Sequence, residues 1–182
     1  MGLVGTLRRT VGLSLCMVML SGLSMDRAWG QEEEAGARAF EHFAKGGLYD
    51  AQNDLLNAIK EYLAAASYDT TSPDIYMALA RDYYQLGQRE DAIRYADKAV
   101  ILDDEAVEAH LVLGKCYRDL RLFEQSRRSF ERVIELDPNH VEAHFSIMQI
   151  AERQNDDSKV LQELEALGRL VPRSADVHFR LA

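Results

Sequence analysis

Cysteine is scarce in this chain, which has only Cys16 and Cys116 among its 182 residues. The N-terminal segment that holds Cys16 is expected to be removed, as argued below, and Cys116 then remains alone. A single cysteine cannot form an internal disulfide, so we expect the fold to depend on packing. We interpret Cys116 as a small buried residue rather than as a catalytic thiol.

Basic side chains are outnumbered, with 21 lysines and arginines against 30 aspartates and glutamates and a net charge of −9. Removal of residues 1–30 takes away three arginines and one aspartate, which leaves 18 basic and 29 acidic side chains and a net charge of −11. An acidic protein repels phosphate backbones, so we do not expect a nucleic acid partner. The sequence also has no run of lysine and arginine that would favour anionic lipid surfaces.

Motifs that carry chemistry are missing as well. The sequence has no glycine-rich phosphate loop, nucleophile elbow or paired-cysteine metal motif. Four of its five histidines recur at multiples of 34 residues, and neighbouring helices would hold them about 8–10 Å apart, whereas zinc needs its ligand nitrogens at about 2 Å. We therefore interpret His42, His110, His144 and His178 as packed, partly buried imidazoles. The sequence predicts no catalytic residue, no cofactor, no metal and no enzymatic activity.

The N-terminus carries an export signal. Arg8 and Arg9 precede an apolar run over residues 11–23, and Ala28-Trp29-Gly30 follows after a short polar stretch. A positive start, an apolar centre and small residues at the cleavage site are typical of a secretory signal peptide. We predict a signal peptide over residues 1–30, an acidic flexible linker over residues 31–38, and a periplasmic or secreted protein without membrane contact after cleavage.

Three other interpretations of the N-terminus are less well supported by the sequence. The apolar run is shorter than the roughly 20 residues of a membrane span, so an uncleaved anchor is the second interpretation. Leu15 stands where a lipoprotein would need a small residue before Cys16, and we reject lipidation. The residues around Arg8-Arg9 match the twin-arginine signal poorly, which favours the general export route.

The remainder of the chain repeats itself every 34 residues. One slot holds a leucine-type residue, the next a mostly small residue, and the slot three positions earlier tyrosine or histidine: Leu79, Leu113, Ile147 and Leu181; Ala80, Gly114, Met148 and Ala182; Tyr76, His110, His144 and His178. Such a period predicts a stack of repeats in which each unit buries its apolar face against its neighbours. Stacks of this kind usually present a surface that binds something.

The best unit reads Tyr76-x-x-Leu79-Ala80-x-x-Tyr83, with Gly87 at the turn. This pattern resembles the tetratricopeptide repeat (TPR) family, whose unit is a pair of antiparallel helices. The resemblance implies an all-α fold, a right-handed α-solenoid of helix-turn-helix repeats. The register gives four units over residues 39–174 (39–72, 73–106, 107–140 and 141–174), and residues 175–182 begin a fifth that we expect to be cut short. Lys45 in the leucine slot and Thr70 in the proline slot depart from the pattern.

In proteins of this family the first helix of each unit lines a concave groove that binds a segment of a partner. In this chain the resemblance assigns the groove lining to two sets of positions. The first is an apolar ladder, one residue after the tyrosine or histidine slot, and the second consists of polar residues one and two helical turns after that ladder. The predicted site comprises Phe43, Met77, Arg81, Tyr84, Leu111, Lys115, Arg118, Phe145 and Phe179. The alternative, equally open at this point, is that Phe43 and its equivalents only complete the packing between units. Modules that clamp chaperone tails use lysine and asparagine along this stripe, so the resemblance does not favour that partner.

The leading functional hypothesis is a non-enzymatic protein–protein interaction scaffold outside the cytoplasm. It would bind protein or peptide segments in processes such as envelope assembly, secretion, pilus building or cytochrome maturation. A second hypothesis is that the repeats recruit partners for an enzyme whose catalytic domain lies beyond residue 182. A third is a homo-oligomer formed through the open C-terminal face.

Overall fold

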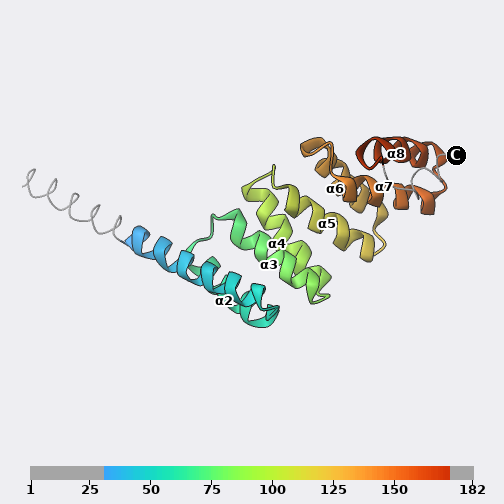
Figure 1. Cartoon of the computed structure of the whole chain (residues 1–182). Helices are drawn as coiled ribbons and strands as arrows, with labels where there is room; N and C mark the ends of the chain where they lie inside the picture. Colours follow the sequence, from blue (N-terminus) through green and yellow to red (C-terminus); the bar gives the residue numbers. More distant parts are fainter. Residues whose placement is uncertain (1–30, 173–182) are drawn as a thin grey trace, which may run out of the picture.

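The computed structural model describes residues 31–172, which form helices joined by short turns and contain no strand (Figure 1). Residues 31–51 are helical, and seven further helices follow: α2 (Leu55–Tyr68), α3 (Pro73–Gln85), α4 (Arg89–Leu102), α5 (Val107–Asp119), α6 (Phe123–Leu136), α7 (Val141–Gln154) and α8 (Asp157–Leu170). The predicted signal peptide, the predicted fifth unit and Phe179 lie outside the described residues. None of the helices between residues 31 and 172 is long and apolar enough to cross a membrane.

The helices succeed one another along the molecule, from the helix over residues 31–51 at one end to α8 at the other (Figure 1). Within the stack α3 packs on α4, α5 on α6 and α7 on α8, while α4 contacts α5 and α6 contacts α7 across unit boundaries. The first helices of the second and third units also meet directly, since α3 contacts α5. The predicted all-α arrangement of stacked helix-turn-helix units is confirmed.

Residues 31–38 are helical, so the prediction of a flexible linker there is wrong. Glutamate, alanine and arginine are good helix formers, and Arg38 forms an ion pair of 2.6 Å with Glu34 one turn earlier. The Arg38 guanidinium also lies 5.8 Å from the ring centroid of Tyr68 on α2. Acidic composition suggested a solvated tail, but these local pairs and the contact with α2 support a helix instead.

The leucine slot supplies core residues in three units and holds a lysine, Lys45, in the first. Leu79, Leu113 and Ile147 are 0%, 6% and 1% exposed, and each belongs to a core cluster that includes residues of the preceding unit. Lys45 occupies the same slot in the first unit, where no described unit precedes it. It is exposed and pairs with Glu41 at 2.6 Å, so a polar residue is tolerated at this end of the stack.

The turn inside each unit uses one left-handed residue. Four residues at intervals of 34 have positive φ: Asn53 (58°), Gly87 (80°), Arg121 (59°) and Asn155 (57°). Glycine and asparagine adopt this conformation readily, whereas other residues do so at a cost of roughly 1–2 kcal/mol. Arg121 is therefore the member of this set that backbone preference does not explain.

Candidate partner-binding surface

The apolar ladder of the predicted groove divides into buried and exposed members. Leu111 is only 5% exposed and belongs to the core between α5, α6 and α7. Phe43 and Met77 are half-buried against the first core cluster, and the Phe43 ring lies 5.4 Å from that of Tyr62. Phe145 on α7 is 40% exposed. The fold uses Leu111 for packing and leaves Phe145 as the ladder member most available to a partner.

Two of the three basic residues in the predicted groove are paired with carboxylates of neighbouring units. Arg81 on α3 forms an ion pair with Asp50 of the preceding first helix, and Lys115 on α5 pairs with Glu142 on α7 at 3.0 Å. These pairs join successive first helices side by side. Arg81 and Lys115 therefore contribute less free positive charge to this face than their number suggests.

Arg118, the third basic residue, donates to Ser146 Oγ on α7 at 3.3 Å and lies 3.7 Å from Asp119. The other basic contact of Asp119 is with Arg89 on α4, at 2.7 Å. The Arg89 guanidinium stacks 4.2 Å from the Tyr84 ring, which half-buries Tyr84 beside it. Arg118 and Arg89 thus share a single carboxylate, which leaves net positive charge at this end of α5.

A cavity of about 260 Å³ opens between the C-terminal end of α5 and α7. Its lining includes Arg118, Arg121 and Arg153, the ring of Phe123, and Gln149. We call these five residues the arginine cavity. The Arg153 guanidinium carbon lies 6.0 Å from the centroid of the Phe123 ring, which gives the cavity an aromatic wall next to its charges.

Sequence reasoning missed Arg121, Phe123 and Arg153, although one signal pointed to each of the two arginines. Arg153 continues the stripe of Phe145 and Gln149 by one more turn of α7, since residues four apart share a helix face. Arg121 stands 34 residues after Gly87, in the turn slot.

A buried carboxylate connects the first two units. Asp82 on α3 is fully buried; its Oδ1 lies 3.5 Å from Arg81, and its Oδ2 has no hydrogen-bond partner among the described residues. Burial is the main reason that the pKa of Asp82 rises to about 6, and the neighbouring Asp50 carboxylate adds to the rise while Arg81 opposes it. The arrangement stores an ionisable group at the first unit boundary, away from the arginine cavity.

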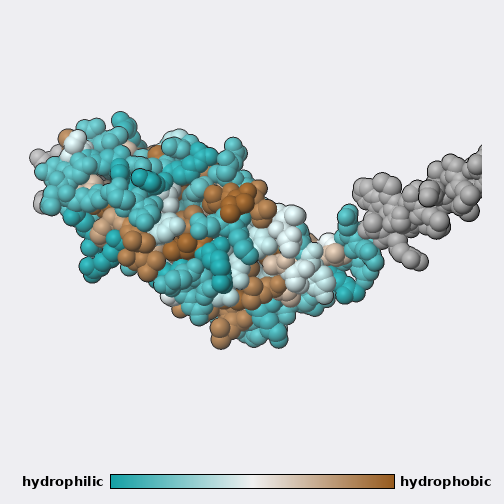
Figure 2. All heavy atoms as spheres, turned by 180° about the vertical axis from the view of Figure 1, so that it is seen from behind, coloured by the Kyte–Doolittle hydropathy of each residue, from teal (hydrophilic) through white to brown (hydrophobic). Residues whose placement is uncertain are grey.

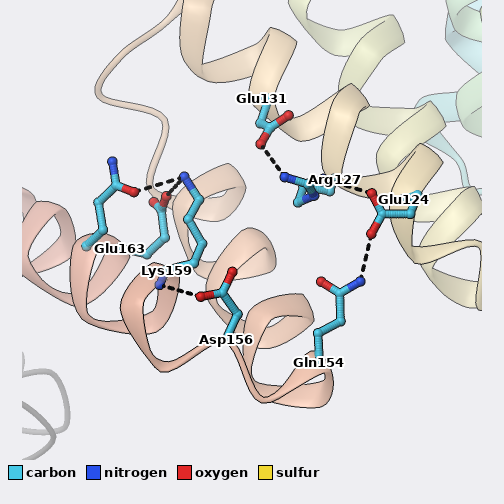
Figure 3. Close-up of polar contacts among 8 residues, drawn as sticks. Glu124, Arg127, Glu131, Gln154, Asp156, Lys159 and Glu163 are labelled. Carbon is cyan, nitrogen blue, oxygen red and sulfur yellow. Dashed lines mark hydrogen bonds and ion pairs between the residues drawn. The ribbon is translucent and has the colours of Figure 1, made fainter.

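The three histidines of the repeated slot that lie within residues 31–172 have structural partners. His144 is buried, and its Nδ1 lies 2.6 Å from Glu163 Oε2 on α8; the Glu163 carboxylate also contacts Lys159 at 2.9 Å (Figure 3). His42 repeats the arrangement with Glu61 at 2.7 Å, whereas His110 contacts the carbonyl of Asp104 at 3.1 Å. His144 also makes the carbonyl contact, with Pro138 at 3.1 Å, 34 residues after Asp104. Among residues 31–172 no group of three or more histidine, cysteine or acidic side chains could hold a metal.

Cys116 is fully buried in α5, and burial raises the pKa of its thiol to about 11. A thiol with so high a pKa stays protonated at neutral pH and is a poor nucleophile. This placement agrees with the interpretation of Cys116 as a packing residue.

Polar contacts also link α6 to α7 at the edge of the arginine cavity. Glu124 accepts a hydrogen bond from Gln154 at 2.8 Å and forms an ion pair with Arg127 at 2.8 Å, and Arg127 reaches Glu131 at 3.3 Å (Figure 3). Glu124 is thus turned toward Arg127 and Gln154. On the face seen in Figure 2, hydrophobic residues reach the surface in separate patches among hydrophilic ones.

A family model described as tetratricopeptide repeat matches the sequence twice, over residues 77–124 and 117–167. A comparison with curated proteins gives no match.

Three solved structures illustrate the structural likeness. The MamA protein superposes with a TM-score of 0.75 at 19% identity, covering 80% of either chain. YrrB, a TPR protein with an unusual peptide-binding site, gives 0.69 at 20% identity over 90% of this chain and 86% of its own. The first TPR of Spaghetti (RPAP3), bound to the HSP90 peptide SRMEEVD, gives 0.64 at 26% identity over 66% of this chain and 95% of its own.

Proposed function

Because this chain belongs to the tetratricopeptide repeat family, we propose that it is a non-enzymatic scaffold that binds segments of protein partners along the face of its first helices. The observation that carries the proposal is Phe145, a large apolar side chain left 40% exposed on α7. Exposed aromatic anchors with polar surroundings are typical of protein-binding surfaces. The peptide sites of YrrB and of the RPAP3 repeat support the same kind of partner.

The proposal includes a location outside the cytoplasm. It rests on Arg8-Arg9, the apolar run and Ala28-Trp29-Gly30, which together are typical of a secretory signal peptide. Envelope assembly, secretion, pilus building and cytochrome maturation are the processes in which an exported scaffold of this kind would serve.

The test selects peptides from a display library on the full chain and measures the affinity of an enriched peptide by fluorescence anisotropy. Phe145→Ala should weaken binding by about 2 kcal/mol or more, as truncation of a buried anchor does. Leu161→Ala is the matched control, because Leu161 is 52% exposed but lies on α8, a second helix. Failure to enrich any peptide, or equal losses in both variants, would contradict the proposed function.

A further inference from the structure

We infer that the arginine cavity binds a carboxylate side chain of an acidic partner segment whose apolar residue rests on Phe145. This inference rests on the proposed function and specifies the chemistry of the partner. Phe145, Gln149 and Arg153 lie on successive turns of one face of α7, and Gln149 and Arg153 line the cavity. The exposed anchor Phe145 therefore lies one helical turn from Gln149 in the cavity lining.

Charge is the first argument. The cavity lining holds three guanidinium groups and one carboxylate, that of Asp119, and Asp119 is shared with Arg89. Glu124, at the edge of the cavity, is held by Arg127 and Gln154 (Figure 3). Within residues 31–172 neither Arg121 nor Arg153 forms an ion pair. A local excess of positive charge thus persists in a protein whose net charge is −9.

Backbone conformation is the second argument. Arg121 has a φ of 59°, in the turn slot where the other three units use asparagine or glycine. A residue held in an unfavourable conformation without a structural reason often serves a function. Here the turn presents a guanidinium group to the cavity, opposite Arg153 on α7.

Size and spacing define the ligand. A volume of about 260 Å³ lies below the range of about 300–1,000 Å³ typical of small-molecule pockets, and it suits an amino-acid side chain. Residues 145 and 153 are eight apart on α7, or about 12 Å along the helix axis. An extended segment spans that distance in about four residues. The expected motif therefore has an apolar residue followed or preceded, about four positions away, by aspartate or glutamate.

The experiment uses the peptides enriched on the full chain, and for each a second version in which acidic residues are changed to their amides. Arg121→Asn restores the residue type of the first and fourth units, and Arg153→Gln keeps the length of a polar side chain. The double variant Arg121→Asn/Arg153→Gln should lose about tenfold or more in affinity at low salt, the effect of one charge-assisted hydrogen bond, without a fall in Tm. The control Lys60→Gln/Arg128→Gln removes the same charge from exposed positions of α2 and α6, away from the cavity lining, and should bind as the parent does.

The outcomes separate the inference from the proposed function. Unchanged binding by the double variant, or equal binding of the acidic and amide peptides, would overturn the inference while a loss in Phe145→Ala would still support the scaffold. Displacement of the peptide by inorganic phosphate at equal ease in parent and double variant would also overturn it, because the anion would then bind elsewhere. If no peptide is enriched at all, both the inference and the proposed function fail.

Discussion

Single side chains decide how closely the two helices of a unit approach. A Cβ atom on Gly114 would lie 2.7 Å from the Phe130 ring, and one on Gly46 would lie 2.5 Å from the Tyr62 ring. The fourth unit places Met148 and Leu164 at the same two slots, within one core cluster. In the first and third units a glycine thus faces an aromatic ring, whereas in the fourth unit the larger Met148 is paired with the smaller Leu164.

Gly114→Met should therefore overpack the third unit and lower the free energy of unfolding by about 1–3 kcal/mol. The double variant Gly114→Met/Phe130→Leu copies the residues of the fourth unit and should recover part of the loss. The measurement is urea denaturation of parent, both single variants and the double variant. The expected coupling free energy is about 0.5–3 kcal/mol; a double variant whose loss equals the sum of the single losses would contradict the pairing of these slots.

Asp82 makes stability depend on pH with an unusual sign. The pKa of its buried carboxyl is about 6 in the folded state, above its ordinary value of 3.8, so the folded protein retains a proton that the unfolded chain releases between those values. The contribution of this group to stability is complete below about pH 4 and is lost as the pH rises through 6. The difference between the two pKa values corresponds to about 3 kcal/mol in the free energy of unfolding.

Asparagine cannot ionise. The free energy of unfolding of Asp82→Asn, relative to that of the parent, should therefore rise by up to about 3 kcal/mol between pH 4 and pH 7. Asp69→Asn is the control with the opposite sign, because hydrogen bonds from the Thr71 amide and hydroxyl lower the pKa of Asp69. The contribution of Asp69 is complete above about pH 3.8 and is lost only at lower pH, so this variant should be less stable than the parent by an amount that hardly changes between pH 4 and 7. Chemical denaturation at pH 4, 5, 6 and 7 measures both; a gap between Asp82→Asn and the parent that does not vary with pH would refute the expectation.

At the scale of helices and turns, periodicity in the sequence was sufficient to predict the fold. A leucine, a small residue and an aromatic at fixed spacing indicate where each first helix packs, and Leu79 and Leu113 are buried as this requires. The spacing could not reveal which carboxylates would meet Arg81 and Lys115, since ion pairs between units depend on how far one helix is offset from the next. It also could not separate Leu111 from Phe145, which occupy one slot although Leu111 lies in a core cluster with residues of α7 and Phe145 is 40% exposed.

Residues 31–38 were predicted as a flexible linker and not as a helix for a related reason. Composition describes how well a segment is solvated, whereas helix formation near Glu34 depends on its pair with Arg38 and on the contact of Arg38 with Tyr68. The turn slot, in contrast, was visible in the sequence as a 34-residue series of Asn53, Gly87, Arg121 and Asn155. Its exception, Arg121, lines the arginine cavity.

For the whole molecule, charge distribution and partner choice are connected. A chain with an excess of acidic side chains repels acidic segments. The positive cavity attracts them only within about 8–10 Å, the screening length at ionic strengths of about 0.1–0.15 M. The protein should then prefer partner segments in which an acidic residue stands close to an apolar one, because Phe145 supplies the apolar contact and the cavity supplies the positive charge. Binding should weaken with salt more steeply than an apolar contact alone would.

Export is the last expectation, and it concerns the complete chain. We expect cleavage after Gly30, so that the mature protein starts at Gln31 or a close neighbour. Its first residues, Glu32 and Glu33, would then stand in the first turn of the helix over residues 31–51, where negative charge interacts favourably with the helix dipole.

Mass spectrometry of the protein recovered from the periplasm or medium of an expressing bacterium should give the mass of a chain that begins near Gln31. Ala28→Leu places a large residue where the cleavage site needs a small one, so this variant should accumulate with Met1 intact. Gln31→Leu, just past the proposed cleavage site, is the control and should be processed. Recovery of the parent with Met1 intact, whether in the cytoplasm or in membranes, would show that residues 1–30 are not a cleaved signal peptide, and the place in which the scaffold meets its partners would have to be revised.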